Sequence, residues 1–115
     1  IGVLLPDAAA VLAVRPDAAA LEGQCVGIVG PYPPGGECAF EVRAITRGGY
    51  EDPVTGSLNA GLGLWLTQSG LAPPRYVASQ GTLLRRRGRV FVDRRGESLW
   101  VGGDVADVVV GTLSL

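Results

Sequence analysis

The sequence contains no histidine, no lysine and no methionine, so all ten basic residues are arginine. Without histidine, the chain lacks the commonest general base at neutral pH and the commonest metal ligand. The only two cysteines, Cys25 and Cys38, form no Cys-x-x-Cys pattern, and two thiols alone cannot complete a four-ligand zinc site. We therefore predict no metal centre. A disulfide stays open, but we expect two buried or half-buried free thiols.

Charge and long apolar segments are also scarce. The net charge is −1 and only 18% of the residues are charged, which gives no reason to expect nucleic acid or an anionic membrane as a partner. The longest uncharged stretch, residues 53–74, contains too many polar side chains and glycines to cross a bilayer. The sequence begins at Ile1 with no pattern typical of a signal peptide. From these features we expect a cytoplasmic protein.

Apolar residues make up 47% of the 115 residues, enough for the core of one domain or of one lobe of a larger protein. In the first half, Asp7 is placed to cap a helix over residues 8–14, which Pro16 ends. Asp17 can cap a second short helix through Leu21. Short apolar or alternating runs predict strands at residues 2–5, 25–29 and 39–46, the first two buried and the third half-buried.

A helix is predicted over residues 57–67, and it is apolar nearly all round. Such a helix is typical of one that is surrounded by protein. Gly61 and Gly63 would each weaken it by about 1 kcal/mol relative to alanine, but they would let neighbouring segments approach closely. Gly70 is a suitable residue to end the helix.

After Pro74 the pattern changes to β-rich runs separated by arginine-rich turns, which predicts an antiparallel meander. Its strands are expected at residues 76–79, 89–93, 98–102 and 105–113. We interpret the arginines as solvated turn residues, with phosphate or RNA contact as the alternative, and Trp65 and Trp100 as core residues. The predicted architecture is α+β, a curled antiparallel sheet with one central apolar helix.

The segment most informative about chemistry is residues 49–57, which read Gly-Tyr-Glu-Asp-Pro-Val-Thr-Gly-Ser. Two carboxylates precede the predicted helix, and the first N–H groups of a helix have no internal acceptor and attract anions. Gly56 would let a ligand approach the backbone, and Ser57 can donate from its hydroxyl. The pattern indicates a carboxylate or phosphate site beside a proton-transferring acid. The alternative is a capped helix start, in which Asp52 and Thr55 satisfy the free N–H groups.

The string Glu-Asp-Pro-Val-Thr-Gly-Ser at residues 51–57 resembles the signature of PhzF-like proteins, the phenazine-biosynthesis branch of the diaminopimelate epimerase fold. Further matches keep the order of that family. They are Phe-Glu-Val-Arg at 40–43, Gln-Gly at 80–81 followed by Arg86 and Val90, Trp-Val-Gly-Gly at 100–103 and Gly-Thr-Leu at 111–113. The resemblance covers residues 40–113 and is looser before them.

The resemblance implies a two-lobed protein in which each lobe is a curled sheet around a helix and the active site lies between the lobes. Residues 1–115 would be a single domain, the C-terminal lobe, and the N-terminal lobe with its proton-shuttling glutamate would be absent from this chain. The resemblance makes Asp52 the catalytic residue of this lobe, and no cofactor or metal is implied. The implied substrate-binding residues are Glu51, Thr55, Gly56 and Ser57.

The implied function is a cofactor-independent isomerase or epimerase that removes and returns a proton on a small carboxylate-bearing metabolite. The chain alone should be inactive without its other lobe. The alternative is a non-catalytic module that binds small carboxylates or serves as a pairing domain. A coding region upstream of Ile1 that encodes a glutamate-bearing first lobe would favour the enzyme.

The sequence also departs from the family pattern. Related epimerases use two cysteines, one in each lobe, but no cysteine stands in or beside residues 49–57, so a two-thiol racemase is not favoured. Arg85 and Arg87 replace the usual glycine and proline. Because the missing lobe would leave apolar surface uncovered, we expect a second copy to take its place. The result would be a homodimer or a larger assembly, with the loops of two copies near the interface.

Overall fold

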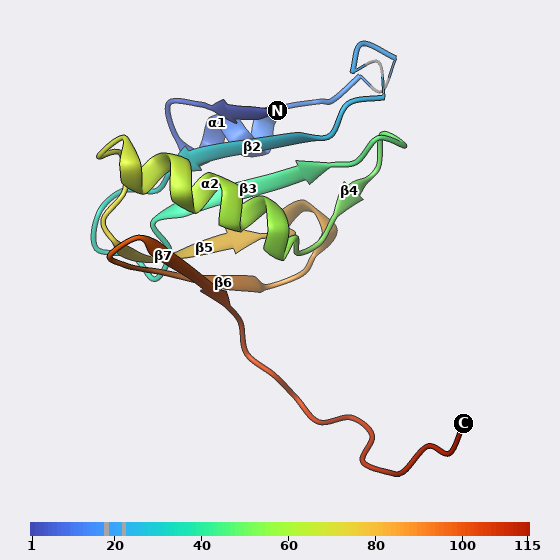
Figure 1. The fold of residues 1–115 in the computed structure, drawn as a ribbon. Coiled ribbons are helices and arrows are strands. Elements are labelled where there is room, and N and C mark those ends of the chain that lie inside the picture. The colour runs from blue at the N-terminus through green and yellow to red at the C-terminus, as the bar shows by residue number, and fades with distance from the viewer. Residues whose placement is uncertain (18, 22) are drawn as a thin grey trace.

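A computed structural model describes residues 1–17, 19–21 and 23–115. Its centre is a seven-stranded sheet in the order β1-β2-β3-β5-β6-β7, with β4 paired to β3. Helix α2 lies across one face of the sheet and α1 lies on the other (Figure 1). The strands are β1 Gly2–Leu4, β2 Val26–Pro31, β3 Phe40–Ile45, β4 Glu51–Asp52, β5 Arg75–Gln80, β6 Gly88–Arg95 and β7 Ser98–Gly102, and the helices are α1 Ala8–Ala13, α2 Gly56–Gln68 and the short 3-10 turn η1 Thr82–Leu84.

The sheet is mixed, so the prediction of a purely antiparallel sheet is wrong. Strands β1 and β2 are parallel, and so are β3 and β5. Each parallel pair is joined by a connection that contains a helix, α1 in the first case and α2 in the second. A parallel pair requires such a crossover, whereas antiparallel neighbours can be joined by a tight turn. The antiparallel meander predicted near the C-terminus is confirmed for β5, β6 and β7.

The first helix forms as predicted. The Asp7 carboxylate accepts a hydrogen bond of 2.7 Å from the N–H of Ala10, which caps α1. The second helix predicted after Asp17 lies partly outside the described residues, and residues 19–21 form a turn. Strand β1 forms where it was predicted, but it is an exposed edge strand and not a buried one.

The main core lies between α2 and the sheet. Leu62 and Leu66 of α2 pack on apolar side chains of β2, β3, β5 and β6. A smaller cluster joins α1 to β2 and β3 on the opposite face, around the fully buried Val11. Because helices cover both faces of β3, all six residues of that strand are buried, and not alternate residues as predicted.

Helix α2 is not surrounded by protein, contrary to the prediction. Leu64 and Trp65 of this helix are 40% and 38% exposed. Trp100, also predicted to be a core residue, is 62% exposed on β7. The sheet supplies only one layer against α2, so the helix face that carries Leu64 is left uncovered by the described part of this chain (Figure 1).

The predicted strand at residues 105–113 does not form. Residues 103–115 contain no helix or strand and extend away from the sheet (Figure 1). Val105, Val108 and Val110 are about nine-tenths exposed. A strand is stabilised by hydrogen bonds to a neighbouring strand, and this segment pairs with none in the described part of the chain, despite its β-branched composition.

Candidate functional site

A cavity of about 560 Å³ lies where the first turns of α2 face the ends of β1, β2 and β3. Its polar wall includes Asp52, Thr55 and Ser57, so the structure brings together three of the residues singled out in the sequence. Its apolar wall includes Leu58, Leu62 and Trp65 of α2. The combination of an apolar surface with a few convergent polar groups is typical of a small-molecule site.

The polar wall is organised by hydrogen bonds. The Thr55 hydroxyl donates to Asp52 Oδ2 over 2.6 Å. The buried amide of Gln80, at the end of β5, donates to the main-chain carbonyl of Asp52 and to Thr55 Oγ1, both over 3.0 Å. Among the described residues, no donor contacts the second carboxylate oxygen of Asp52. That oxygen is therefore available to a ligand in the cavity.

The start of α2 is not capped by a side chain, which contradicts the capped-helix alternative. Thr55 is the N-cap residue, but its hydroxyl bonds to Asp52 and not to a helix N–H. The N–H groups of Gly56, Ser57 and Leu58 have no acceptor in the described part of the chain. Uncapped N–H groups at the start of a helix favour a bound anion.

Glu51 is not part of the cavity wall. Its Oε2 accepts two hydrogen bonds from the guanidinium of Arg43, over 2.8 and 3.1 Å, and both side chains are at least nine-tenths buried. Arg43 also donates to the carbonyls of Val11 and Val14 at the end of α1. This buried ion pair connects β4 to β3 and α1, and so holds the loop that precedes Asp52.

Gly56 and Ser57 are both exposed at the start of α2. A side chain added at Gly56 would meet no atom within 4 Å, so the space beside its backbone is open. The hydroxyl of Ser57 makes no hydrogen bond with the described residues, and Ser57 lines the cavity. Ser57 therefore faces the cavity, whereas Gly56 is open to solvent beside it and is not one of the lining residues.

Several cavity residues were not expected from the sequence. Cys25 and Thr46 line the cavity because the β2–β3 register pairs Val26 with Ile45 and so sets the two residues opposite each other. Cys25 is exposed and Cys38 is buried, and both are free thiols. The prediction of two buried or half-buried free thiols is therefore confirmed for Cys38, whereas Cys25 is free but exposed. Although no cysteine is near the loop in sequence, Cys25 shares a cavity with Asp52 in space.

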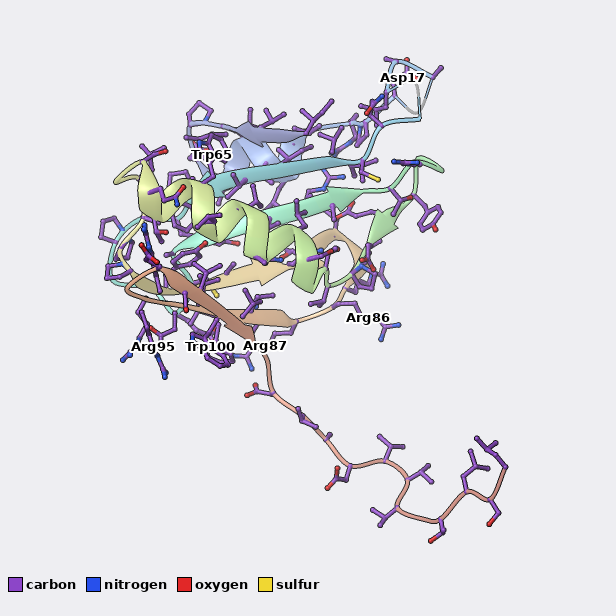
Figure 2. All side chains as sticks on the ribbon, in the orientation of Figure 1. Asp17, Trp65, Arg86, Arg87, Arg95 and Trp100 are labelled. Atoms are coloured by element: carbon purple, nitrogen blue, oxygen red, sulfur yellow. The ribbon has the colours of Figure 1, made fainter. Side chains whose placement is uncertain are left out.

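The arginine-rich turns lie outside the cavity. Arg85, Arg86 and Arg87 are exposed, as predicted, and Figure 2 shows Arg86 and Arg87 on the β6 side of the molecule. Arg87 and Arg89 both pair with Glu37, over 3.0 Å in each case, and their hydrogen bonds lower the pKa of the Glu37 carboxyl. These charges face their own partners at the surface.

No group of three or more His, Cys, Asp or Glu side chains among the described residues is arranged to hold a metal ion. No helix within the described ranges is long and apolar enough to cross a membrane.

The fold and its cavity can be compared with known proteins. A phenazine biosynthesis PhzC/PhzF protein from Clostridium difficile matches with a TM-score of 0.71 and 23% identity, over 99% of this chain and 44% of that one. A phenazine biosynthesis protein of the PhzF family from Enterococcus faecalis matches with a TM-score of 0.69 and 22% identity, over 89% of this chain and 39% of that one. No protein-family profile and no curated protein sequence matches the chain.

The structure and these matches together place the chain in the α+β class, with a mixed seven-stranded sheet and two helices. More particularly, the chain has the fold of one lobe of a PhzF-type protein, in agreement with the resemblance of its loop. It spans less than half the length of each of the two solved chains.

Proposed function

We propose that this chain is the C-terminal lobe of a cofactor-independent isomerase that acts by proton transfer on a small carboxylate-bearing metabolite. The observation that carries the proposal is the cavity in which Asp52 faces the uncapped start of α2. The similarity of the fold to part of PhzF-type proteins supports it. In the complete protein, the second lobe would cover the exposed outer face of α2 and close the cavity.

In this proposal the two ends of the polar wall have different tasks. The start of α2, with Gly56 and Ser57, binds the carboxylate through N–H groups and a hydroxyl. Asp52 assists the proton transfer, because it lines the same cavity as Ser57 and one of its carboxylate oxygens has no partner among the described residues. Thr55 supports Asp52, and Glu51 acts through its ion pair with Arg43, which fixes the loop. The proton shuttle itself comes from the other lobe.

The test is a substitution of Asp52 in the two-lobed protein encoded by the complete reading frame. Asp52→Asn keeps the shape of the side chain and removes its capacity to accept a proton. We expect turnover to fall by roughly a hundredfold or more, since general acid–base catalysis contributes on that scale. Asp93→Asn is the control, because Asp93 of β6 pairs with Arg75 of β5 and Arg95 of β6, outside the cavity. Full turnover of Asp52→Asn would remove Asp52 from the mechanism.

A second function, carboxylate binding without catalysis, is favoured by one observation. The cavity and the free N–H groups of α2 are formed within this chain, without a second lobe. Titration calorimetry of the isolated chain with small mono- and dicarboxylates would detect such binding, and Ser57→Ala should weaken it. If the complete two-lobed protein binds carboxylates but isomerises none of them, the binding module is the better description.

A further inference from the structure

Gln80 is completely buried, although its side chain is a polar amide. The amide makes four hydrogen bonds, and every partner belongs to residues 52–59, the loop and first turn of α2 beside the cavity. A side-chain amide has two N–H donors and an oxygen with two lone pairs, so four bonds satisfy it completely. Gln80 therefore uses its whole hydrogen-bonding capacity to hold the candidate site.

Main-chain groups determine which end of the amide is oxygen and which is nitrogen. The Thr55 N–H can only donate, and it donates to Gln80 Oε1 over 3.2 Å. The carbonyl of Asp52 can only accept, and it accepts from Gln80 Nε2 over 3.0 Å. Asn59 is oriented in the same way, because its Nδ2 donates to the Thr55 carbonyl over 2.9 Å and to Gln80 Oε1 over 2.8 Å. A flipped Gln80 amide would lose these bonds.

This orientation decides the direction of the Thr55 hydroxyl, which lies between Gln80 Nε2 and Asp52 Oδ2. Since Nε2 can only donate, Thr55 Oγ1 accepts from it, and the hydroxyl proton is left for Asp52. We infer that Gln80 is a positioning residue of the candidate site: it directs the Thr55 hydroxyl proton onto one oxygen of Asp52 and leaves the other oxygen to the ligand.

The inference rests on the proposed function, and it limits which groups of the site can donate hydrogen bonds to a ligand carboxylate. The N–H of Thr55 donates to Gln80 and its hydroxyl donates to Asp52, so Thr55 has no donor left. A ligand carboxylate would then take its hydrogen bonds from Ser57 and the free N–H groups of α2. The ligand group that faces Asp52 must itself be a donor of a hydrogen bond or of a proton. Thr55 thus supports the site without touching the carboxylate.

The residue that follows Gln80 allows the end of β5 to come close to the loop. Gly81 has φ +86°, and a Cβ at this position would lie 2.6 Å from the carbonyl oxygen of Pro53. Only glycine tolerates both the left-handed backbone and that contact. The end of β5 therefore sits directly against the loop, which is what brings the Gln80 amide within reach of Asp52 and Thr55.

The main test is Gln80→Glu in the 115-residue chain, examined by NMR. The introduced carboxylate can accept from Thr55 N–H and Asn59, but it cannot donate, so the Thr55 hydroxyl should turn from Asp52 to the new carboxylate. In the unmodified chain the hydroxyl proton should correlate with the Asp52 carboxyl carbon, and in Gln80→Glu with the carboxyl carbon of the introduced side chain. Gln24→Glu, which makes the same change at an exposed residue, should leave the Asp52 correlation intact. A hydroxyl that still bonds to Asp52 in Gln80→Glu would overturn the inference.

Acid should reverse the effect of the substitution. Once protonated, the introduced carboxyl group regains an O–H donor, and burial favours the protonated form. The deficit in Tm of Gln80→Glu should therefore shrink as the pH is lowered from about 8 to about 5, while the small difference of Gln24→Glu stays constant. A deficit of Gln80→Glu that does not change with pH would contradict the donor role of Gln80.

The inference can be tested even if Gln80→Glu does not fold, and separately from the proposed function. If Gln80→Glu does not fold, hydrogen exchange in the unmodified chain replaces it: the side-chain N–H groups of Gln80 should exchange roughly tenfold or more slowly than those of exposed Gln24 and Gln68, and equal rates would overturn the inference. The NMR measurements need no substrate. A correct hydroxyl orientation with a fully active Asp52→Asn enzyme would thus reject only the catalytic role proposed for Asp52, and the opposite pair of results would reject only the role of Gln80.

Discussion

The buried pair of Arg43 and Glu51 holds the loop before Asp52 to β3 and to the end of α1. The Arg43 side chain is only 5% exposed, and it satisfies one carboxylate oxygen and two carbonyls of α1 and the residue that follows it. A paired charge in such a place contributes little by itself, but one left without its partner is very unfavourable. The pair therefore fixes the positions of β3, β4 and the end of α1 relative to one another.

We predict that Arg43→Met lowers the free energy of unfolding by about 3–5 kcal/mol, because it leaves the Glu51 carboxylate buried without a partner. Arg87→Met is the control, since its pair with Glu37 is exposed and should contribute less than about 1 kcal/mol. Urea denaturation of the two variants gives the comparison. The double variant Arg43→Met, Glu51→Gln should recover part of the loss, and a deficit as large as that of Arg43→Met would show that the carboxylate is not its cause.

The raised pKa values of two tyrosines predict how the stability of the fold changes in alkaline solution. Burial raises the pKa of Tyr76 to about 12, and burial together with a hydrogen bond to Glu41 raises the pKa of Tyr32 to about 12. The unfolded value is near about 10. A raised pKa means that the folded state binds the proton more tightly, so this contribution is complete below about pH 10 and is lost as the pH rises through about 12.

The free energy of unfolding should therefore fall between about pH 10 and about pH 12. The absence of lysine removes the side chains that usually dominate this range, so the slope can be assigned with few competitors. Denaturation at about pH 9, 10 and 11 measures the slope, and Tyr76→Phe and Tyr32→Phe should each reduce it. An unchanged slope in both variants would mean that other groups titrate.

Among the elements, α2 determines both the core and the cavity, and two of its glycines have opposite surroundings. A Cβ at Gly63 would lie 2.9 Å from Val92 Cγ1 and 3.1 Å from Leu99 Cδ2. A Cβ at Gly61 would meet nothing within 4 Å. From the sequence alone the two residues looked equivalent, and the close approach expected at both occurs only at Gly63.

We predict opposite effects for alanine at these two positions. Gly61→Ala should stabilise the chain by about 0.5–1 kcal/mol, because alanine is the better helix former and no contact is disturbed. Gly63→Ala should destabilise it by about 1–3 kcal/mol, because α2 would have to move away from β6 and β7. Thermal unfolding of the two single variants provides the measurement. Equal shifts of Tm would mean that α2 does not pack tightly at Gly63.

Most helices and strands could be predicted from the sequence, but the pairing of the strands could not. Periodicity and caps placed both helices and nearly every strand, because Asp7 and the apolar spacing of α2 act locally. Pairing could not be read in this way, because the parallel partners of β1 and β3 follow from how the helices cross the sheet. For the site, the loop at residues 49–57 was predicted, but Cys25, Thr46 and the amide of Gln80 reach it only through the folded register.

At the scale of the whole molecule, two of the exposed apolar surfaces are candidates for association. One is the surface of α2 at Leu64 and Trp65, and the other is the tail at residues 103–115 with its exposed valines. Apolar patches of this kind promote association. The two surfaces lie apart, with the tail leading away from β7 (Figure 1).

We predict that the isolated chain forms a homodimer or a larger assembly at micromolar concentration. Sedimentation velocity would show a species heavier than the 11.9 kDa monomer. Trp65→Glu should weaken the association if the face of α2 is the contact, and deletion of residues 104–115 should do so if the tail is. A monomer in the unmodified chain would show that neither surface needs a cover.

The difference between the two thiols has a practical consequence. Cys25 is exposed and lines the candidate cavity, whereas Cys38 is buried and its burial raises the pKa of its thiol. Since the thiolate is the reactive form, electrophilic dyes should label Cys25 first and leave Cys38 largely untouched. The native chain thus offers one reactive thiol that lines its own cavity. A fluorophore attached to Cys25 would report ligand entry without any engineered residue.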